Sequence, residues 1–441
     1  MRSADRTWQP EATLQFSTTN QVFVAVLWLA LYGQWLTLVP IVIPDQIAGI
    51  LGPSNPAKEG IAGTIGAAGA LVALVVAPIA GALSDRARGA RGRRRRFLIF
   101  GILGTCVGLA LLALFVPGSS IFLYALAVLH LQFWWNWTAG PYAGLIPDVV
   151  PGIAQSTASG WMNVMSILGI IVGSALVYEF YAAGKILPVA AMFIGLNILC
   201  LLLTLAGVRE PPAAGAETSF DLRVFIRSFY LDPRAHPNFY WVLLTRLMAN
   251  MGIWSVFTFL LFYLEEIVGL DRDAATNLLP LLLGGGTVIA IPSTLLAVRM
   301  ANRHGVVGIV QIASWVMAAA VIGYVLIALH PTLVLVVLAM LIFGAANGAY
   351  NAVDWALALK VLPAGRDSGK DMGIWHICMV LPQVVGPGAT GWLITGIKIA
   401  VSSRLAYEVA FGIGALWFTL AAMLVARVRL TEQMRAGTDG S

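Results

Sequence analysis

Four polar residues in an otherwise apolar stretch have the spacing of one helix face. Asn347, Tyr350, Asn351 and Asp354 recur at i, i+3, i+4 and i+7 among Ala, Leu, Val and Phe. A charge at the centre of a membrane span costs about 2.5–3.5 kcal/mol and usually faces a bundle interior or a water-filled cavity. The stripe therefore indicates either a cavity wall that binds solute, which we favour, or a polar contact between helices.

A single basic residue, Arg246, lies inside an apolar stretch rather than at the end of one. Along the helix axis, Arg246, Asp354 and His376 each lie on the order of 10 Å from the nearer predicted end of their apolar stretch. Because an unpaired charge is costly in an apolar medium, we predict an ion pair between Arg246 and Asp354, with His376 close enough to sense it. The pair is either a coupling site, in which Asp354 binds the proton, or a permanent structural contact.

The fourth apolar stretch has polar and aromatic residues on two faces. Gln132 and Asn136 share one face, whereas His130, Trp134 and Trp137 share nearly the opposite one. Indole rings suit sugar rings, but tryptophans in spans also pack or lie at the membrane interface. One face can line a cavity, and the sequence does not decide which.

Other polar residues within spans are more isolated. Tyr32, Gln34 and Trp35 lie in the first apolar stretch, and Asn250 lies in the seventh. With the residues above they complete the candidate solute-binding set, which is Tyr32, Gln34, Trp35, Gln132, Asn136, Asn250, Asn347, Tyr350 and Asn351.

The composition places these residues in a lipid bilayer. Of the 441 residues, 59% are hydrophobic and 11% are charged, whereas soluble domains have about 25% charged residues. A spanning helix needs about 20 mostly apolar residues. Twelve stretches of this kind predict an all-α polytopic membrane protein, and they lie near residues 20–43, 61–83, 97–116, 121–146, 156–180, 187–208, 239–263, 274–298, 306–329, 332–359, 369–397 and 405–426.

The sequence argues against several other classes of function. Cys106, Cys200 and Cys378 lie in apolar runs, so neither a disulfide framework nor a zinc site is expected. There is no phosphate loop and no nucleophile constellation, so we predict no enzyme activity, no cofactor and no metal. The net charge of +6 belongs to loops at a membrane surface, and we expect no nucleic-acid partner.

The stretch from Gly81 to Arg96, GALSDRARGARGRRRR, fixes the predicted orientation. Lys and Arg accumulate in short cytoplasmic loops. With both termini on the side of this loop, twenty-one of the 27 Lys and Arg residues are cytoplasmic and five are external. We therefore expect a multi-pass plasma-membrane protein with cytoplasmic termini. We expect the following residues to lie near the external ends of the spans, in contact with water: Glu179, Glu265, Glu266, His330 and Glu408.

A polar, proline-rich break divides the twelve stretches into six and six, and the halves resemble each other. GWMNVMSILGIIVG, from Gly160 to Gly173, matches GIWHICMVLPQVVG, from Gly373 to Gly386. Repeated halves of this kind form a solute site at their interface near the membrane midplane. We predict six-helix bundles at 1–208 and 239–427, a cytoplasmic linker at 209–238, a cytoplasmic tail at 428–441, and a monomer.

These features resemble the major facilitator superfamily over nearly the whole chain. Gly81, Asp85, Arg86, Gly92 and Arg93 stand in the order of its loop between helices two and three. SDRARGARGRRRRF is similar to the SDR…GRRRPF loop of sucrose/proton symporters and their glycoside–pentoside–hexuronide relatives. NWTAGPYAGLIPD, residues 136–148, is similar to their N…QGPxRALLAD stretch. The resemblance implies twelve helices in two pseudo-symmetric six-helix bundles.

The resemblance also implies a gate in the arginine-rich loop. Asp85 would face the N-terminus of the span at 369–397, where the helix dipole stabilises a carboxylate by about 0.3–1 kcal/mol. The alternative is a loop that only sets the orientation in the membrane. The residues assigned to the gate are Gly81, Asp85, Arg86, Gly92, Arg93 and Arg94.

The resemblance implies a secondary transporter that works by alternating access. We expect symport of a sugar or glycoside-like small solute with a cation, either a proton or sodium. Gln132 stands where sucrose symporters have a titratable aspartate, and the second span lacks the acids with which melibiose-type symporters bind cations. The alternatives are a proton-coupled exporter of amphipathic compounds and a non-transporting receptor or lipid-handling protein of the same fold.

Overall fold

Helices make up every regular element in the part of the chain that the computed structural model describes. That part leaves out residues 1–16, 89–91, 182–184, 211–235, 362–367 and 430–441. Most of the predicted linker at 209–238 and of the predicted tail at 428–441 therefore lies outside the described residues.

Two groups of helices follow one another along the chain. The N-terminal group comprises α1 (Thr18–Ala25), α2 (Leu27–Thr37), the π-helical η1 (Leu38–Val42), α3 (Ile43–Leu51), α4 (Lys58–Arg86), α5 (Arg95–Leu112), α6 (Ile121–Ala143), α7 (Leu145–Val149), α8 (Gly152–Phe180) and α9 (Ile186–Gly207). The C-terminal group comprises α11 (Pro237–Phe257), α12 (Leu260–Glu266), α13 (Arg272–His304), α14 (Val306–Ile327), α15 (Leu333–Val361), α16 (Ser368–Ala400) and α17 (Ser403–Val425).

The long helices correspond to the twelve predicted spans. Nine helices of the described part are long and apolar enough to cross a membrane, and the bent pair of α11 and α12 makes a tenth. α6 and α16 have the length of spans but a more polar composition, which in α6 includes His130, Gln132 and Asn136. The predicted all-helical, twelve-span fold is thus confirmed.

The first span is longer than predicted. Its helices continue beyond Ile43 to Leu51 with a π-helical stretch in the middle. Pro40 and Pro44 lack the N–H that an α-helix uses, and a wider turn accommodates them without ending the helix. The extension carries Asp45 and Gln46, both buried.

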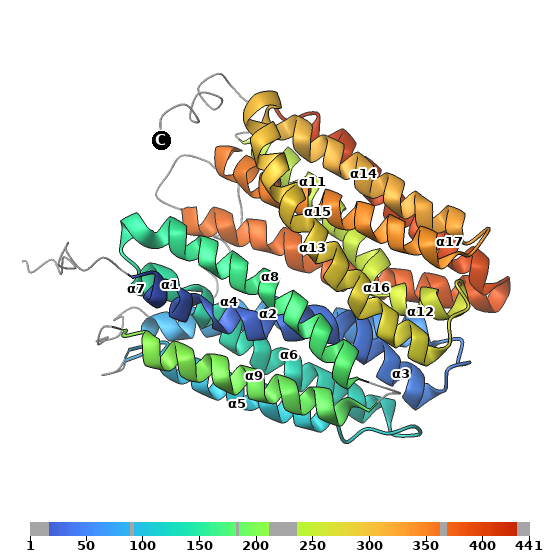
Figure 1. The fold of residues 1–441 in the computed structure, drawn as a ribbon, viewed down its shortest axis with the longest axis horizontal. Coiled ribbons are helices and arrows are strands. Elements are labelled where there is room, and N and C mark those ends of the chain that lie inside the picture. Colours follow the sequence, from blue (N-terminus) through green and yellow to red (C-terminus); the bar gives the residue numbers. More distant parts are fainter. Residues whose placement is uncertain (1–16, 89–91, 182–184, 211–235, 362–367, 430–441) are drawn as a thin grey trace, which may run out of the picture.

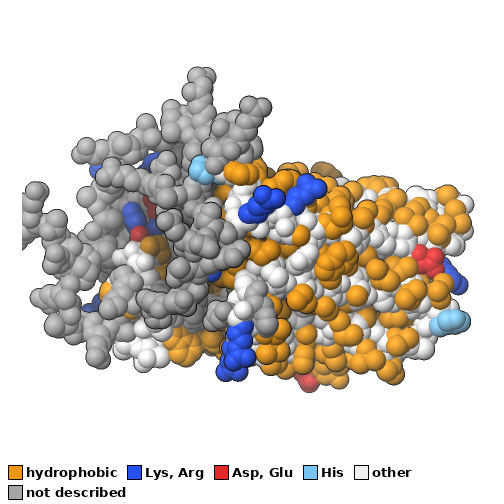
Figure 2. All heavy atoms as spheres, turned by 90° about the horizontal axis from the view of Figure 1, so that it is seen from above, with side chains coloured by type: hydrophobic (Ala, Val, Ile, Leu, Met, Phe, Trp, Pro, Cys, Tyr) orange, Lys and Arg blue, Asp and Glu red, His pale blue; other side chains and the backbone are white. Residues whose placement is uncertain are grey.

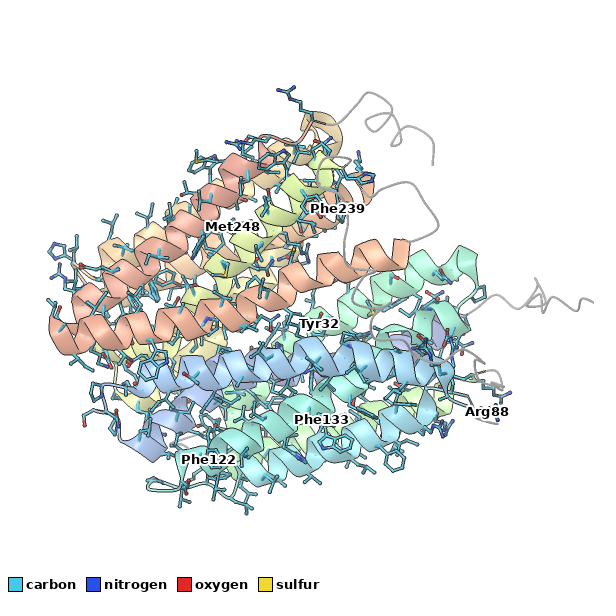
Figure 3. The ribbon with its side chains drawn as sticks, turned by 180° about the vertical axis from the view of Figure 1, so that it is seen from behind. Tyr32, Arg88, Phe122, Phe133, Phe239 and Met248 are labelled. Carbon is cyan, nitrogen blue, oxygen red and sulfur yellow. The ribbon has the colours of Figure 1, made fainter. Side chains whose placement is uncertain are left out.

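The two groups meet at one end of the molecule and separate toward the other. Figure 1 shows the C-terminal group above the N-terminal group, with α3 and α12 close together on the right and the upper end of α14 well above α7, which lies at the left. α4 contacts α16, and α8 contacts α13 across the boundary. We call the end with the arginine-rich loop, marked by Arg88 in Figure 3, the loop end, and the opposite end, near Phe122, the far end.

The exterior is apolar, as a bilayer requires. Figure 2 shows hydrophobic side chains over most of one face, with few charged side chains, mostly beside the grey residues or at the opposite end. Phe100, Leu199 and Leu295 are among the large apolar residues that are more than half exposed. Without a hydrophobic driving force between helices in lipid, close packing of small residues must hold the helices together.

Glycines provide this close packing between α2 and α8. A Cβ atom added at Gly33 would come within 3 Å of the carbonyl oxygen of Gly169, and one added at Gly169 would meet the backbone at Leu29. The two backbones therefore approach too closely for any larger residue at these positions.

We expect Gly33→Ala to lower the thermal stability of the purified protein, because overpacking a close contact costs about 1–3 kcal/mol. Gly195→Ala in α9 is the matched control, since nothing lies within 4 Å of a Cβ atom added there. The control should be unchanged or slightly more stable, because Ala favours helices. Equal melting temperatures for the two variants would contradict the close contact.

Candidate functional site

A small, largely apolar pocket of about 30 Å³ lies between the two groups of helices, and its few polar and aromatic residues carry no charge. The side chains from the N-terminal group include Trp35 and Gln132, and those from the C-terminal group include Trp254, Thr258 and Gln383. Apolar residues of α3, α4, α6 and α16 complete the wall. Amides and indoles of this kind can hydrogen-bond and stack on a neutral, polar ring.

One wall of the pocket is held by stacked tryptophans. Trp35 of α2 stacks on Trp135 of α6, with ring centroids 5.1 Å apart and ring planes inclined by 29°. The indole N–H of Trp135 donates to the carbonyl oxygen of Leu31 at 3.1 Å, which locks the ring against α2. The stack gives Trp35 a fixed orientation beside the pocket.

The two faces of α6 have different surroundings. Gln132 lines the pocket, and Asn136 is buried and donates to the backbone oxygen of Gln132 at 2.8 Å. Trp137 stacks on Phe97 of α5, and an atom added at Gly104 of α5 would meet Trp134. The pocket is therefore on the Gln132 side, and these two tryptophans pack within their own group.

Gln34 is bound to a neighbouring helix, whereas Tyr32 and Asn250 contact residues of their own helices. Asn197 of α9 donates to the side-chain oxygen of Gln34 at 2.7 Å, and Gln34 is 1% exposed. Tyr32 is half-buried and meets Trp28 edge-on. Asn250 donates to the backbone oxygen of Arg246 at 2.9 Å. Figure 3 labels Tyr32 at the boundary between the two groups.

The predicted pair between Arg246 and Asp354 is present. Nη1 of Arg246 on α11 donates to Oδ2 of Asp354 on α15, and the two side chains are 6% and 0% exposed. Tyr350 is 1% exposed, one helical turn before Asp354. The pair lies within the C-terminal group. The side chain of His376, which we predicted to be nearby, lies outside the described residues.

The stripe on α15 divides between two environments. α15 approaches α13 through Gly344 and Gly348, whereas Tyr350 and Asp354 are buried on the side of α11. Helical spacing puts Asn347 and Asn351 between these two sides. Asn351 is exposed and donates to the backbone oxygen of Asn347 at 2.9 Å. These two amides therefore face space that neither helix fills.

The residues assigned to the gate form an ion-pair cluster at the loop end. Nε of Arg94 lies 2.6 Å from Asp148, Nη2 of Arg94 lies 2.7 Å from Asp85, and Nη2 of Arg93 lies 2.6 Å from Asp148. The guanidinium of Arg86 donates to Ala82 at 2.9 Å. All these partners belong to the N-terminal group. The predicted contact of Asp85 with the start of α16 is not tested, because the side chains there lie outside the described residues.

Of the two glycines assigned to the gate, Gly92 is required for this cluster to form. Gly92 has a φ of 100°, a conformation that residues with a side chain rarely adopt. An added Cβ there would also collide with Glu210, whose Oε2 accepts the backbone N–H of Arg94 at 2.9 Å. A Cβ atom added at Gly81 would make only an ordinary contact with Gly140 of α6, at 3.8 Å.

Charge and burial shift the pKa values of two carboxyl groups at this cluster in opposite directions. Burial alone would raise the pKa of Asp148, but the hydrogen bonds and charges of Arg94 and Arg93 outweigh it, so this pKa lies below its ordinary value. Burial raises the pKa of Glu210 above its ordinary value, because its hydrogen bond from the Arg94 backbone compensates only in part.

The prediction of solvated edges is wrong for Glu265 and Glu266. Their side chains are only 12% and 15% exposed, and both pair with Lys58, which is 2% exposed. The prediction failed because the far-end segments of the two groups cover each other there.

Sequence analysis also missed Gln383 as a residue of the pocket. Its amide is isolated within an apolar stretch, and this is the signal that could have identified it.

Comparisons with known proteins identify a family and a fold. The family model described as Major Facilitator Superfamily matches residues 23–368. A search of curated proteins finds no match.

Solved transporters have similar structures. The nucleoside transporter NupG has a TM-score of 0.66 at 15% identity, covering 93% of this chain and 99% of its own. A D-xylose–proton symporter has a TM-score of 0.65 at 15% identity, covering 90% and 96%. A bacterial homologue of the human lysosomal transporter Spinster, in an inward-facing conformation, has a TM-score of 0.66 at 14% identity, covering 94% and 100%. At these identities the likeness shows the fold.

We expect Asp148→Asn to lower the thermal stability at pH 7, with a difference that disappears in acid. A carboxyl group whose pKa is lowered by folding stabilises the protein above its unfolded pKa, and this contribution is lost as the pH falls through the lower folded pKa. The difference in melting temperature should therefore be constant from pH 7 to about 5 and shrink below about 4. A difference that does not shrink at all between pH 5 and pH 3 would contradict the charge-based origin. Asn20→Ala, at an exposed helix start, controls for general acid sensitivity.

Proposed function

The chain belongs to the major facilitator superfamily, and on that premise we propose that it is a cation-coupled symporter of a sugar or glycoside-like solute. Transporters of this fold work by alternating access, with the solute bound between two repeats near the midplane. The proposal names the solute class, the binding residues and the coupling group.

The uncharged pocket carries the proposal on the solute. Trp35 and Trp254 offer indole faces, and Gln132 and Gln383 offer amide groups from opposite sides. Hydroxyl-rich rings use both kinds of contact, whereas a charged solute would leave an unpaired charge in this pocket. The similar folds include transporters described for a nucleoside and for D-xylose. Both belong in the panel of test solutes, since a nucleoside is itself a glycoside.

The separation at the loop end supports an assignment of the conformation. If the arginine-rich loop is cytoplasmic, as the positive-inside rule predicts, the molecule is closed outside and open inside. Asn347 and Asn351 then face the inward path of the solute. Asp85, half-exposed and bound to Arg94 in this conformation, would be available to the start of α16 when the loop ends close together.

The buried pair of Arg246 and Asp354 supports the proposal on coupling. A proton on Asp354 would neutralise it and release Arg246, which changes the electrostatics of the C-terminal group without moving a charge into the solute pocket. Solute and cation would thus bind at separate sites.

Replacing Gln132 or Trp35 with Ala should weaken solute binding about tenfold, the loss expected for one hydrogen bond or one stacking contact in a buried site. Binding is measured as the solute-induced rise in melting temperature with pentoses, hexoses, glycosides, nucleosides and amphipathic cations. Trp315→Ala on α14 is the matched control, because Trp315 is 45% exposed on the exterior. Unchanged binding in both pocket variants, or protection by the cations alone, would contradict the sugar-like solute.

Replacing Asp354 with Asn should abolish accumulation driven by a pH gradient in proteoliposomes, while exchange of labelled for unlabelled solute continues. Asn can still accept a hydrogen bond from Arg246, although losing the charge partner of a buried ion pair costs about 3–5 kcal/mol. The double variant Arg246→Gln/Asp354→Asn should recover stability but not accumulation. Wild-type accumulation by Asp354→Asn would assign the pair a structural role only.

A further inference from the structure

The far end holds a partly buried charge cluster that joins the two groups of helices. Lys58 of α4 pairs with Glu266 of α12 at 2.9 Å and with Glu265 at 3.5 Å. Lys398 of α16 pairs in return with Glu59 of α4 at 2.9 Å, and also with Glu266. Each lysine therefore reaches a carboxylate of the other group, so the contacts last only while the far end is closed.

A second contact across the boundary adjoins this cluster. Arg272, at the start of α13, holds both carboxylate oxygens of Asp45 on α3, one of them at 2.8 Å, and the hydroxyl of Tyr181 also donates to Asp45. Asp45 is fully buried. The extension of the first span beyond its predicted end places it there.

With all its acids and bases ionised, the cluster has a net charge of −1. Its acids are Asp45, Glu59, Glu265 and Glu266, and its bases are Lys58, Lys398 and Arg272. Tyr407 of α17 adds a neutral donor, whose hydroxyl lies 3.1 Å from Glu59. An uncompensated charge in a site largely closed to water is costly, and one bound proton removes it.

Among the acids of the cluster, Glu59 is the fully buried one whose second oxygen has no hydrogen-bond partner, so its negative charge is poorly compensated. Its side chain is 0% exposed, and both Lys398 and Tyr407 donate to the same oxygen, Oε1. The other oxygen, Oε2, is buried and has no hydrogen-bond partner, and the same is true of Oε2 of Glu266. Because Glu59 and Glu266 flank one ammonium group, the two carboxylates lie close enough to repel each other.

We propose that the closed far end binds one proton at Glu59, in a site shared with Glu266 and Lys398, and that this proton stabilises the closed conformation. When the groups separate at this end, water reaches the cluster and the carboxylates ionise, so the proton leaves. A hollow that opens at the surface and is lined by Lys58, Glu266 and Lys398 gives the proton a path. This site is distinct from Asp354 and does not depend on the proposed solute.

The test measures closure of the far end as a function of pH. Spin labels are placed at Ser54, in the exposed loop before α4, and at Val401, 67% exposed in the turn after α16. The full-length protein is held in nanodiscs, and Cys106, Cys200 and Cys378 are replaced by Ala. The ratio of short to long distances reports closed and open far ends.

In the unsubstituted protein the closed-to-open ratio should rise on acidification from pH 8 to pH 5, by up to tenfold per pH unit, which is the limit for one proton bound only in the closed form. Glu59→Gln should be closed at every pH, because the neutral amide replaces the protonated acid. Glu266→Gln should also lose the pH dependence. Glu408→Gln, in an exposed pair with Arg404 at the same end, should keep the unsubstituted response.

The outcomes separate this site from the proposed coupling group. Asp354→Asn should keep the pH dependence of the far end even where it abolishes accumulation. A ratio that does not depend on pH in the unsubstituted protein overturns the proposal. An unsubstituted response in Glu59→Gln, or its loss in Asp354→Asn, overturns the assignment to Glu59.

Discussion

The structure depends on one constraint, which is that a charge within an apolar medium needs a partner. Arg246 and Asp354 satisfy it inside the C-terminal group. Arg94 and Asp148 satisfy it at the loop end, and Lys58 and Glu266 satisfy it at the far end. Because desolvation makes an unpaired charge costly, each pair holds its two helices at a defined distance.

The position of these pairs relative to the boundary determines where the molecule can open. At the loop end the described pairs lie within the N-terminal group, so no described ion pair is broken when the groups separate there. At the far end four pairs cross the boundary, Lys58 with Glu265 and Glu266, Arg272 with Asp45, and Lys398 with Glu59, and separation would break them. Among the described residues this difference accompanies the observed conformation, which is parted at the loop end and joined at the far end (Figure 1).

The polar groups that line the central pocket and the charged groups lie in different parts of the fold. The central pocket has amide and indole groups but no charged lining, whereas the charges lie in the C-terminal group or at the two ends. A neutral pocket can release its solute without breaking an ion pair. In the proposed mechanism, protons bound at sites that the solute does not touch set the conformational preference.

The sequence by itself determined the membrane environment, the helices and their approximate ends, because apolar length and turn chemistry are local properties. It also determined the pair of Arg246 and Asp354, since the fixed rise of a helix converts distance from a span end into depth. The tertiary structure alone decided which face of α6 meets the pocket and that Trp135 stacks on Trp35, because helix rotation depends on neighbouring helices. It also decided that Glu59 is buried and that Glu265 and Glu266 are largely covered. Position near a span end predicts contact with water, and only the second group of helices, distant in sequence, excludes it.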